Sequence, residues 1–142
     1  MRKDKVEIYI HVMWTTWNRE FLLTPELELD LFPILVGMGE RHKVQTLTIN
    51  GVPDHLHWLV KFSSTTRLCD LVKDAKGTSS LTLNARLGNF KWRPTYAAYS
   101  VSRWDVRQLI RYIANQKEHH SQKTADPRLE PGDFADNIPD GE

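Results

Sequence analysis

The sequence predicts an α+β protein with a ferredoxin-like (RRM-like) split βαβ sandwich: an antiparallel sheet, two crossover helices and one added carboxy-terminal helix. Segments rich in β-branched and aromatic residues alternate with amphipathic segments in the order β-α-β-β-α-β-α. The chain has 142 residues, of which 40% are hydrophobic and 26% charged, so it suits one domain with one main core.

The first half predicts three strands and one helix. Residues 5–17 read as a strand, and Thr24-Pro25 supplies a helix cap and a first helical residue. Apolar residues follow at helical spacing, and Pro33 within them predicts a kink or a late helix start. Residues 44–50 and 55–62 are β-prone and flank the turn-forming residues 51–54, which predicts a hairpin.

The second half predicts two more helices around one strand. A helix begins at Leu68, and Gly77 with the neighbouring Ser-rich stretch at 78–80 is expected to interrupt it before residues 81–87. Gly88-Asn89 should end it, and residues 90–101 are β-prone again. A last helix is expected from Ser102, with Asp105 completing a capping box, to about His120. The folded domain should span residues 1–123, and residues 124–142 form an acidic, Pro- and Gly-containing tail expected to be irregular.

The net charge of +1 conceals a strong asymmetry along the chain. Residues 1–60 sum to −2, residues 61–123 to +8 and the tail to −5. A basic central half can neutralise phosphates locally, although a solvated basic helix face fits the same numbers.

The cysteine content and the distribution of apolar residues exclude several classes of protein. The single cysteine, Cys69, rules out an internal disulfide and a multi-cysteine zinc site. No run approaches the roughly 18 apolar residues of a membrane span, and the amino terminus shows no apolar signal region. We therefore expect a cytoplasmic protein.

A pair of histidines in the predicted strand 55–62 is a candidate metal site. Alternate side chains of a strand share a face, so His55 and His57 should point the same way from Cα atoms roughly 7 Å apart. Two imidazoles can hold one metal ion if another element supplies a third ligand. Two exposed histidines on a half-buried strand fit the pattern equally well.

The last predicted helix presents a tyrosine among polar residues. Its apolar stripe is Val106, Leu109, Ile110 and Ile113, and a second stripe contains Asp105, Gln108, Tyr112, Gln116 and His119. A tyrosine kept for packing would be expected among the isoleucines. Tyr112 is therefore a candidate for chemistry, while a half-buried tyrosine with a hydrated hydroxyl remains the alternative.

Four segments together resemble a known family. They are HLH at 55–57 after GVPD, KGTSS at 76–80, YAAYSVS at 96–102 and YIANQKEHH at 112–120. In this order they resemble the single-tyrosine HUH transposases of insertion sequences, the TnpA-like group that includes the REP-associated tyrosine transposases. The resemblance extends from about Tyr9 to His120.

This resemblance implies a mechanism and partners. His55, His57 and Gln116 would bind Mg²⁺ or Mn²⁺, and Tyr112 would be the nucleophile that forms a 5′-phosphotyrosine link while a 3′ hydroxyl is released. The substrate would be single-stranded DNA with a hairpin, and the protein would be a homodimer whose tyrosine helix can serve the partner's histidines. It would associate with the nucleoid when bound to DNA.

Other residues were assigned from their types and positions. Candidate DNA contacts are the basic side chains of the central half and the last helix: Lys73, Lys76, Arg103, Arg107, Arg111 and His119. His11, on the first strand, is more typical of a hydrogen-bonded core histidine than of a metal ligand. Two other functions stay open: a nucleic-acid binding module without catalysis, such as a domesticated relative, and a metal-dependent phosphodiesterase that uses water.

Overall fold

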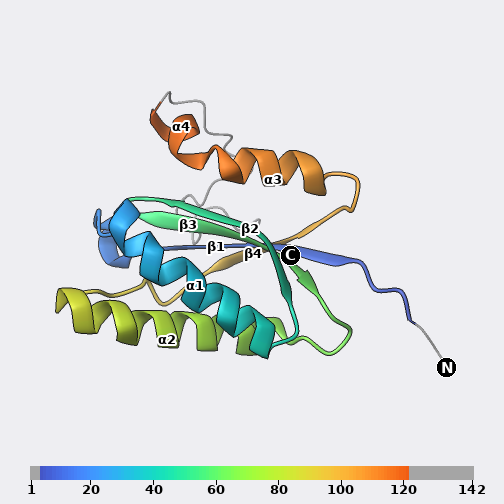
Figure 1. Ribbon diagram of the computed structural model, residues 1–142, viewed down its shortest axis with the longest axis horizontal. Helices are drawn as coiled ribbons and strands as arrows, with labels where there is room; N and C mark the ends of the chain where they lie inside the picture. The colour runs from blue at the N-terminus through green and yellow to red at the C-terminus, as the bar shows by residue number, and fades with distance from the viewer. Residues whose placement is uncertain (1–3, 122–142) are drawn as a thin grey trace, which may run out of the picture.

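The computed structural model describes residues 4–121, and its elements follow the predicted order (Figure 1). In chain order they are β1 Ile8–Thr15, the 3₁₀ turn η1 Trp17–Arg19, α1 Pro25–Arg41, β2 Gln45–Val52, β3 His55–Phe62, α2 Leu68–Leu87, β4 Ala97–Val101, α3 Val106–Ala114 and α4 Gln116–Ser121. The tail from Thr124 lies outside the described residues.

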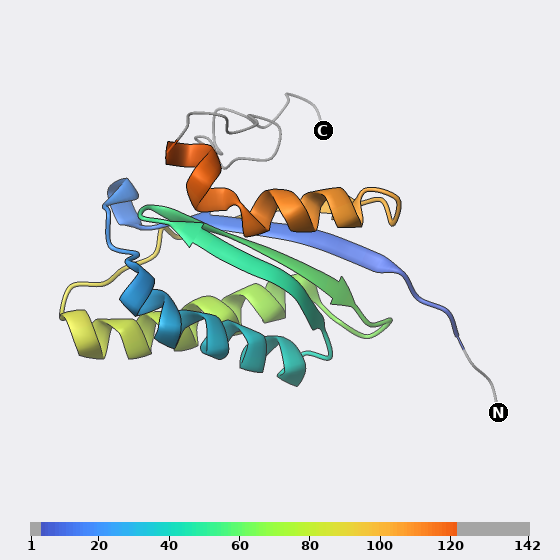
Figure 2. The same cartoon turned by 45° about the horizontal axis from the view of Figure 1, so that its top comes forward.

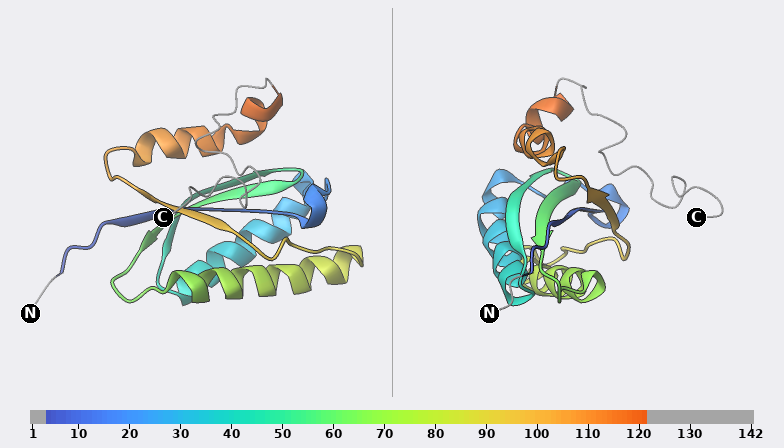
Figure 3. Two further views of the ribbon diagram at one scale, coloured as in Figure 1. Left: turned by 180° about the vertical axis from the view of Figure 1, so that it is seen from behind. Right: turned by 90° about the vertical axis from the view of Figure 1, so that its right-hand side faces the viewer.

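The sheet has the topology of a split βαβ sandwich. Its strand order is β2-β3-β1-β4, and every neighbouring pair is antiparallel. Helices α1 and α2 cover one face, and α3 lies across the opposite face (Figures 1 and 3). The predicted fold class is therefore confirmed.

The main core lies between the sheet and α1 and α2. Alternate residues of the two central strands point into it, among them Val12 and Trp14 of β1 and Leu56 and Trp58 of β3, all fully buried. The indoles of Trp14 and Trp58 meet edge to face with ring centroids 6.2 Å apart. Most of the apolar burial that stabilises the fold is on this side.

The predicted start of α1 is confirmed, but the effect of its proline is not. Thr24 Oγ1 accepts a hydrogen bond from the Leu27 amide at 3.2 Å, with Pro25 as the first helical residue. The helix then continues through Pro33, so the expected late start was wrong. Pro33 is exposed, and the buried residues around it keep the helix against the sheet.

Helix α2 is continuous where an interruption was expected. It runs through Gly77 because it buries Leu71, Ala75 and Leu83 on one face. Ser79 is buried among them, where its hydroxyl donates to the Ala75 carbonyl and accepts from Trp92 Nε1 at 2.9 Å. Tertiary packing thus overrides the low helix propensity of this stretch. Gly88 ends the helix as predicted, with φ of +82°.

The carboxy-terminal helix differs from its prediction at both ends. It begins at Val106, and the Asp105 side chain makes no cap hydrogen bond, so the predicted capping box is absent. It stops at Ala114, and α4 begins at Gln116 (Figure 2). The side-chain amide of Asn50 donates to the carbonyls of Ile113 and Ala114, at 3.0 and 3.1 Å. These carbonyls would accept amides from the next turn of a continuous helix, so Asn50 accounts for the break.

The bounds of the hairpin strands and of the last strand differ from those predicted. β2 continues to Val52, which leaves a connection of two residues, Pro53 and Asp54. β4 covers 97–101, whereas Trp92 makes only an isolated bridge to Thr16. Within residues 4–121, no helix is long and apolar enough to cross a membrane.

Candidate active site

The two histidines of β3 lie on the sheet face that α3 covers. Leu59, two residues beyond His57 on the same face, packs against Leu109 and Ile113 of α3. The imidazoles of His55 and His57 are 1% and 0% exposed, and their ring centroids are 5.4 Å apart. The predicted shared face is confirmed, and the alternative of two exposed histidines is wrong.

Each imidazole has its Nδ1 engaged by a different kind of partner. Asp54 Oδ1 lies 2.7 Å from Nδ1 of His55, and His11 Nε2 lies 2.8 Å from Nδ1 of His57. A metal ion would therefore be bound through Nε2 of both rings. Histidine ligands in metalloproteins show this arrangement, in which the second ring nitrogen holds the ring orientation.

The carboxylate beside His55 remains ionised well below neutral pH. Burial raises the pKa of Asp54, but hydrogen bonds from His55 and from Arg19 outweigh it and lower that pKa to about 2. Arg19 Nε is 2.9 Å from the second carboxylate oxygen. Arg19 itself has φ of +53°, a conformation rare outside glycine, in the turn after β1. The turn thus orients a cation onto Asp54 and, through Asp54, fixes His55.

Gln116 is brought to the same side of the sheet as the histidine pair. It is the first residue of α4, and its side chain is fully buried. Asn50 lies opposite His57 in the β2–β3 ladder, so its side chain projects from the histidine face. Its hydrogen bonds to the end of α3 therefore fix the start of α4 over the strand position beside His57.

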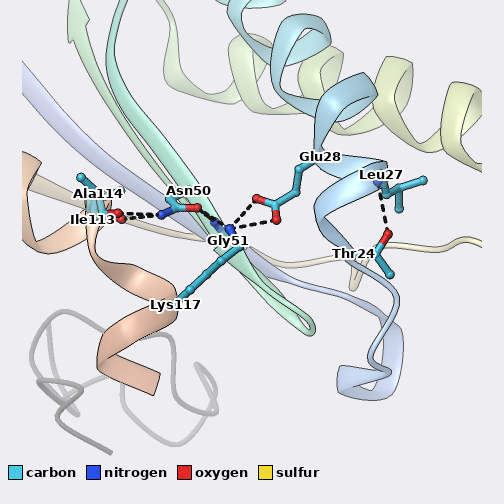
Figure 4. Close-up of polar contacts among 8 residues, drawn as sticks. All are labelled: Thr24, Leu27, Glu28, Asn50, Gly51, Ile113, Ala114 and Lys117. Carbon is cyan, nitrogen blue, oxygen red and sulfur yellow. Dashed lines mark hydrogen bonds and ion pairs between the residues drawn. The ribbon is translucent and has the colours of Figure 1, made fainter. Parts of the chain in front are cut away.

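An ion pair reinforces this junction from the other side (Figure 4). Lys117 Nζ donates to Asn50 Oδ1 at 2.7 Å and lies 2.9 Å from the nearer carboxylate oxygen of Glu28. Glu28, on α1, is nearly buried, so this contact joins helices from opposite faces of the sheet past Gly51. Sequence reasoning did not single out Asn50 or Glu28, because a turn-adjacent Asn and a helical Glu carry no local signal.

Tyr112 lies on α3, four residues before Gln116 of α4, and is half-buried. The predicted apolar stripe of this helix packs on the sheet: Leu109 and Ile113 are buried, with Val106 and Ile110 beside them. Tyr112 is next to this stripe rather than within it. The helix that carries the tyrosine thus covers the histidine face of its own chain.

The candidate DNA contacts fall into separate groups. Arg107 and Arg111 are exposed on α3, whereas Lys73 and Lys76 are on α2 beyond the opposite face of the sheet. Arg103 pairs with Glu7 at 3.1 Å. The structure does not bring these predicted contacts together, and the His119 side chain lies outside the described residues.

Lys76 has a structural role that its sequence position did not reveal. Its ammonium donates to the main-chain carbonyls of Arg93 and Thr95, and burial lowers the pKa of Lys76 to about 8. It thereby anchors the segment before β4 against α2. A basic cleft remains beside it, and its lining includes Lys73, Lys91, Arg93, Trp92 and Tyr96.

The donors present fit a divalent ion of the transition series. Within residues 4–121, no three His, Cys, Asp or Glu side chains are placed to hold a metal ion together, so a complete site formed by these residues needs an amide, phosphate or water oxygen. Thr15, which pairs with His55 across the ladder, is fully buried, and its hydroxyl has no hydrogen-bond partner among the described residues. Buried hydroxyls are normally hydrogen-bonded, so this atom indicates that the site accepts a further polar group. Mg²⁺ and Mn²⁺ prefer oxygen ligands, so a pair of imidazoles suits them less than carboxylates would, and substrate phosphate and water would have to supply the remaining oxygen atoms.

Fold and site together define a ferredoxin-like protein with a buried histidine pair beneath a tyrosine-bearing helix. Residues 4–116 match the family described as "Transposase IS200 like", and the chain belongs to this family. It is therefore a transposase, a member of a class of enzymes that cut and rejoin DNA. The predicted resemblance to this family is confirmed.

Individual relatives agree with this assignment. The ISDra2 transposase TnpA of Deinococcus radiodurans is 26% identical over 129 residues, which cover 83% of this chain and 92% of the relative. A crystal structure of a protein assigned as a transposase from Deinococcus radiodurans R1 superposes with a TM-score of 0.65 at 25% identity, covering 82% of this chain and 98% of that one. A REP-associated tyrosine transposase bound to a REP hairpin has a TM-score of 0.64 at 15% identity, over 84% of this chain and 73% of its own, which shows a shared fold.

Proposed function

We propose that this transposase cuts and rejoins single-stranded DNA through a 5′-phosphotyrosine intermediate, with Tyr112 as nucleophile. His55, His57 and Gln116 would hold the divalent ion. The observation that carries the proposal is the buried imidazole pair, with Nδ1 of each ring engaged, on the sheet face covered by the helix of Tyr112. Imidazoles that served packing alone would not need this arrangement beneath a tyrosine.

The chemical step is a reversible exchange at phosphorus. The Tyr112 oxygen attacks the scissile phosphate, the bond from phosphorus to the 3′ oxygen breaks, and the 3′ oxygen leaves as a hydroxyl after taking up a proton. The phenol loses its own proton in the attack. Rejoining runs in reverse, because a 3′ hydroxyl attacks the phosphotyrosine and the phenol is restored. The covalent link conserves the bond energy, so no other energy source is needed.

Each residue of the site has a distinct task in this step. A divalent ion would neutralise the phosphate oxygens that repel a nucleophile. His55 and His57 would hold it on a rigid strand, and Gln116 would contribute an amide oxygen from the start of α4. Because Asn50 fixes the end of α3, it also sets how close Tyr112 approaches the strand.

The DNA partner is proposed to contain a hairpin, in keeping with the REP hairpin bound by the transposase of similar fold. Exposed Arg107 and Arg111 would contact phosphates near Tyr112. Lys73, Lys91 and Arg93 of the basic cleft would contact DNA farther from it. Aromatic rings beside cations suit single strands, because bases stack on them without sequence preference.

The test is the formation of a covalent adduct. The protein is incubated with labelled single-stranded oligonucleotides that carry imperfect palindromes, together with Mg²⁺ or Mn²⁺. We expect an adduct resistant to denaturation, lost in Tyr112→Phe and in His55→Ala but retained in the control Tyr96→Phe. Tyr96 packs against the main core on the other side of the sheet, and phenylalanine keeps its ring there. Cleavage that leaves no adduct and persists in Tyr112→Phe would instead support a metal-dependent phosphodiesterase that uses water.

Assembly is proposed as a homodimer, and a mixing experiment tells within-chain from cross-chain catalysis. Helix α3 packs on the sheet of its own chain, which favours catalysis within one chain. Tyr112→Phe and His55→Ala proteins are mixed under conditions of subunit exchange. Activity that reappears in the mixture would show that one chain's tyrosine serves the partner's histidines, and sedimentation would establish the dimer.

The alternative function is a catalytically inactive or domesticated nucleic-acid binding protein. The basic cleft on the α2 side would be sufficient for it, because this cleft does not involve the histidines. DNA binding without cleavage, unchanged in His55→Ala, would support this alternative.

A further inference from the structure

His11 lies directly against one of the two candidate metal ligands. It is on β1, 46 residues before His57 in the sequence, and is 2% exposed. Its Nε2 is 2.8 Å from Nδ1 of His57. The ring centroids are 5.0 Å apart and the planes are inclined by 23°, so the two rings are nearly coplanar and meet edge to edge at this hydrogen bond. Two neutral imidazoles in such contact share one proton across the hydrogen bond.

The position of that proton decides whether His57 can bind a metal. A neutral imidazole carries one proton, and a nitrogen that carries it cannot coordinate an ion. If His57 holds the proton on Nδ1, it donates to His11, and its Nε2 is available as a ligand atom. If His11 donates instead, the proton of His57 is on Nε2 and blocks coordination. His11 must therefore accept this hydrogen bond, with its own proton on Nδ1.

The other candidate ligand, His55, has only one possible position for its proton. Asp54 accepts a hydrogen bond from Nδ1 of His55, and an ionised carboxylate has no proton to donate. His55 is thus fixed in the metal-binding tautomer by charge alone. His57 has an imidazole in the corresponding place, which can either donate or accept.

We propose that His11 is a positioning residue for His57: it accepts the hydrogen bond from Nδ1, fixes the metal-binding tautomer and thereby holds the ring orientation. The inference rests on the proposed metal site at His55 and His57, but it does not require Tyr112 to act as nucleophile. It also changes the interpretation of His11 from a core residue to a part of the site.

Two substitutions distinguish the contribution of the hydrogen-bond acceptor of His11 from that of its aromatic ring. His11→Phe keeps a planar aromatic ring at this position and removes the acceptor. His11→Gln removes the ring but can place an amide oxygen near the position of Nε2. Mn²⁺ affinity of the metal-free protein is measured by the paramagnetic resonance signal of free Mn²⁺, and thermal unfolding in a chelator reports on the fold. We expect His11→Phe to weaken Mn²⁺ binding by about 10- to 100-fold and His11→Gln to recover most of this loss.

A double substitution tests that the effect passes through His57. In a His57→Ala background, His11→Phe should cause no further loss of Mn²⁺ affinity. Wild-type affinity in a folded His11→Phe protein would overturn the proposal, as would equal weakening by Phe and Gln. If the wild type binds Mn²⁺ no better than His57→Ala, the metal site of the proposed function fails and the present inference fails with it.

A measurement on the wild type needs no variant. Nitrogen-15 correlation spectra of the imidazole rings distinguish protonated from unprotonated nitrogens. With diamagnetic Zn²⁺ bound, we expect a protonated Nδ1 and a coordinated Nε2 in His57, and an unprotonated Nε2 in His11. A protonated Nε2 in His11 would overturn the proposal even if both variants failed to fold.

Discussion

On the face of the sheet covered by α1 and α2, the side chains that β1 and β3 bury are apolar, with Trp14 and Trp58 among them. On the face covered by α3, the same strands bury four polar groups, His11, Thr15, His55 and His57, beside the apolar Met13 and Leu59. Buried polar groups cost free energy unless they are hydrogen-bonded. The comparison indicates that one face supplies the stability that the other needs to hold unfavourable groups in place.

Truncation within the main core should have the largest effect on stability. Leu35 is fully buried on α1, so Leu35→Ala removes apolar contacts and leaves a cavity. We expect the free energy of unfolding to fall by about 3 kcal/mol, measured by urea denaturation. The control Leu29→Ala, on the exposed side of the same helix, should change it by less than about 0.5 kcal/mol. Equal effects at the two positions would show that the main core is not the source of stability.

The carboxylate beside His55 should make the histidine face sensitive to acid. The folded-state pKa of Asp54 is about 2, against an ordinary value of 3.8. A lowered pKa contributes stability that is fully present above the unfolded value and is lost as the pH falls through the folded one. The difference corresponds to about 2 kcal/mol.

Urea denaturation between pH 5 and pH 2 measures this loss. Compared with Asp54→Asn, the wild type should lose its advantage progressively between pH 4 and pH 2. A constant difference across this range would contradict the proposed ionic contact with His55 and Arg19.

Loosening the helix junction should have an intermediate effect that is confined to the histidine face. Asn50→Asp keeps the acceptor for Lys117 but loses both donations to the end of α3. We expect a loss of about 1–2 kcal/mol, because each hydrogen bond contributes roughly 1 kcal/mol net. Hydrogen exchange should show faster opening of α3 than of the central strands. The exposed Asn89→Asp is the matched control, and α3 protection equal to the wild type would contradict the role given to Asn50.

The smallest expected effects on stability are those of substitutions at the starts of two helices, α1 and α3, on opposite faces of the sheet. Thr24 caps α1 through its hydroxyl, so Thr24→Ala should cost about 1 kcal/mol in thermal or urea unfolding. Asp105 precedes α3 without a side-chain cap hydrogen bond, so Asp105→Ala should cost only a few tenths of a kcal/mol through the helix dipole. A loss at Asp105 equal to that at Thr24 would reverse the comparison.

Local patterns predicted most of the elements, and the errors have a common cause. The cap at Thr24, the hairpin and the end of α2 at Gly88 follow from neighbouring residues. The continuity of α2 through Gly77 and the break after Ala114 depend on contacts with distant residues, Trp92 and Asn50. The capping box failed because Ser102 and Asp105 can also form a turn, which the folded chain adopts.

The sequence by itself determined the order of elements, the shared face of His55 and His57 and the polar position of Tyr112, because strand and helix periodicities are local properties. The tertiary structure decided what surrounds these residues: His11 against His57, Arg19 on Asp54, and Asn50 at the junction before Gln116. These contacts join residues 35 to 63 positions apart. The packing of strands, turn and helix against one another fixes such contacts, and no local pattern in the chain encodes them.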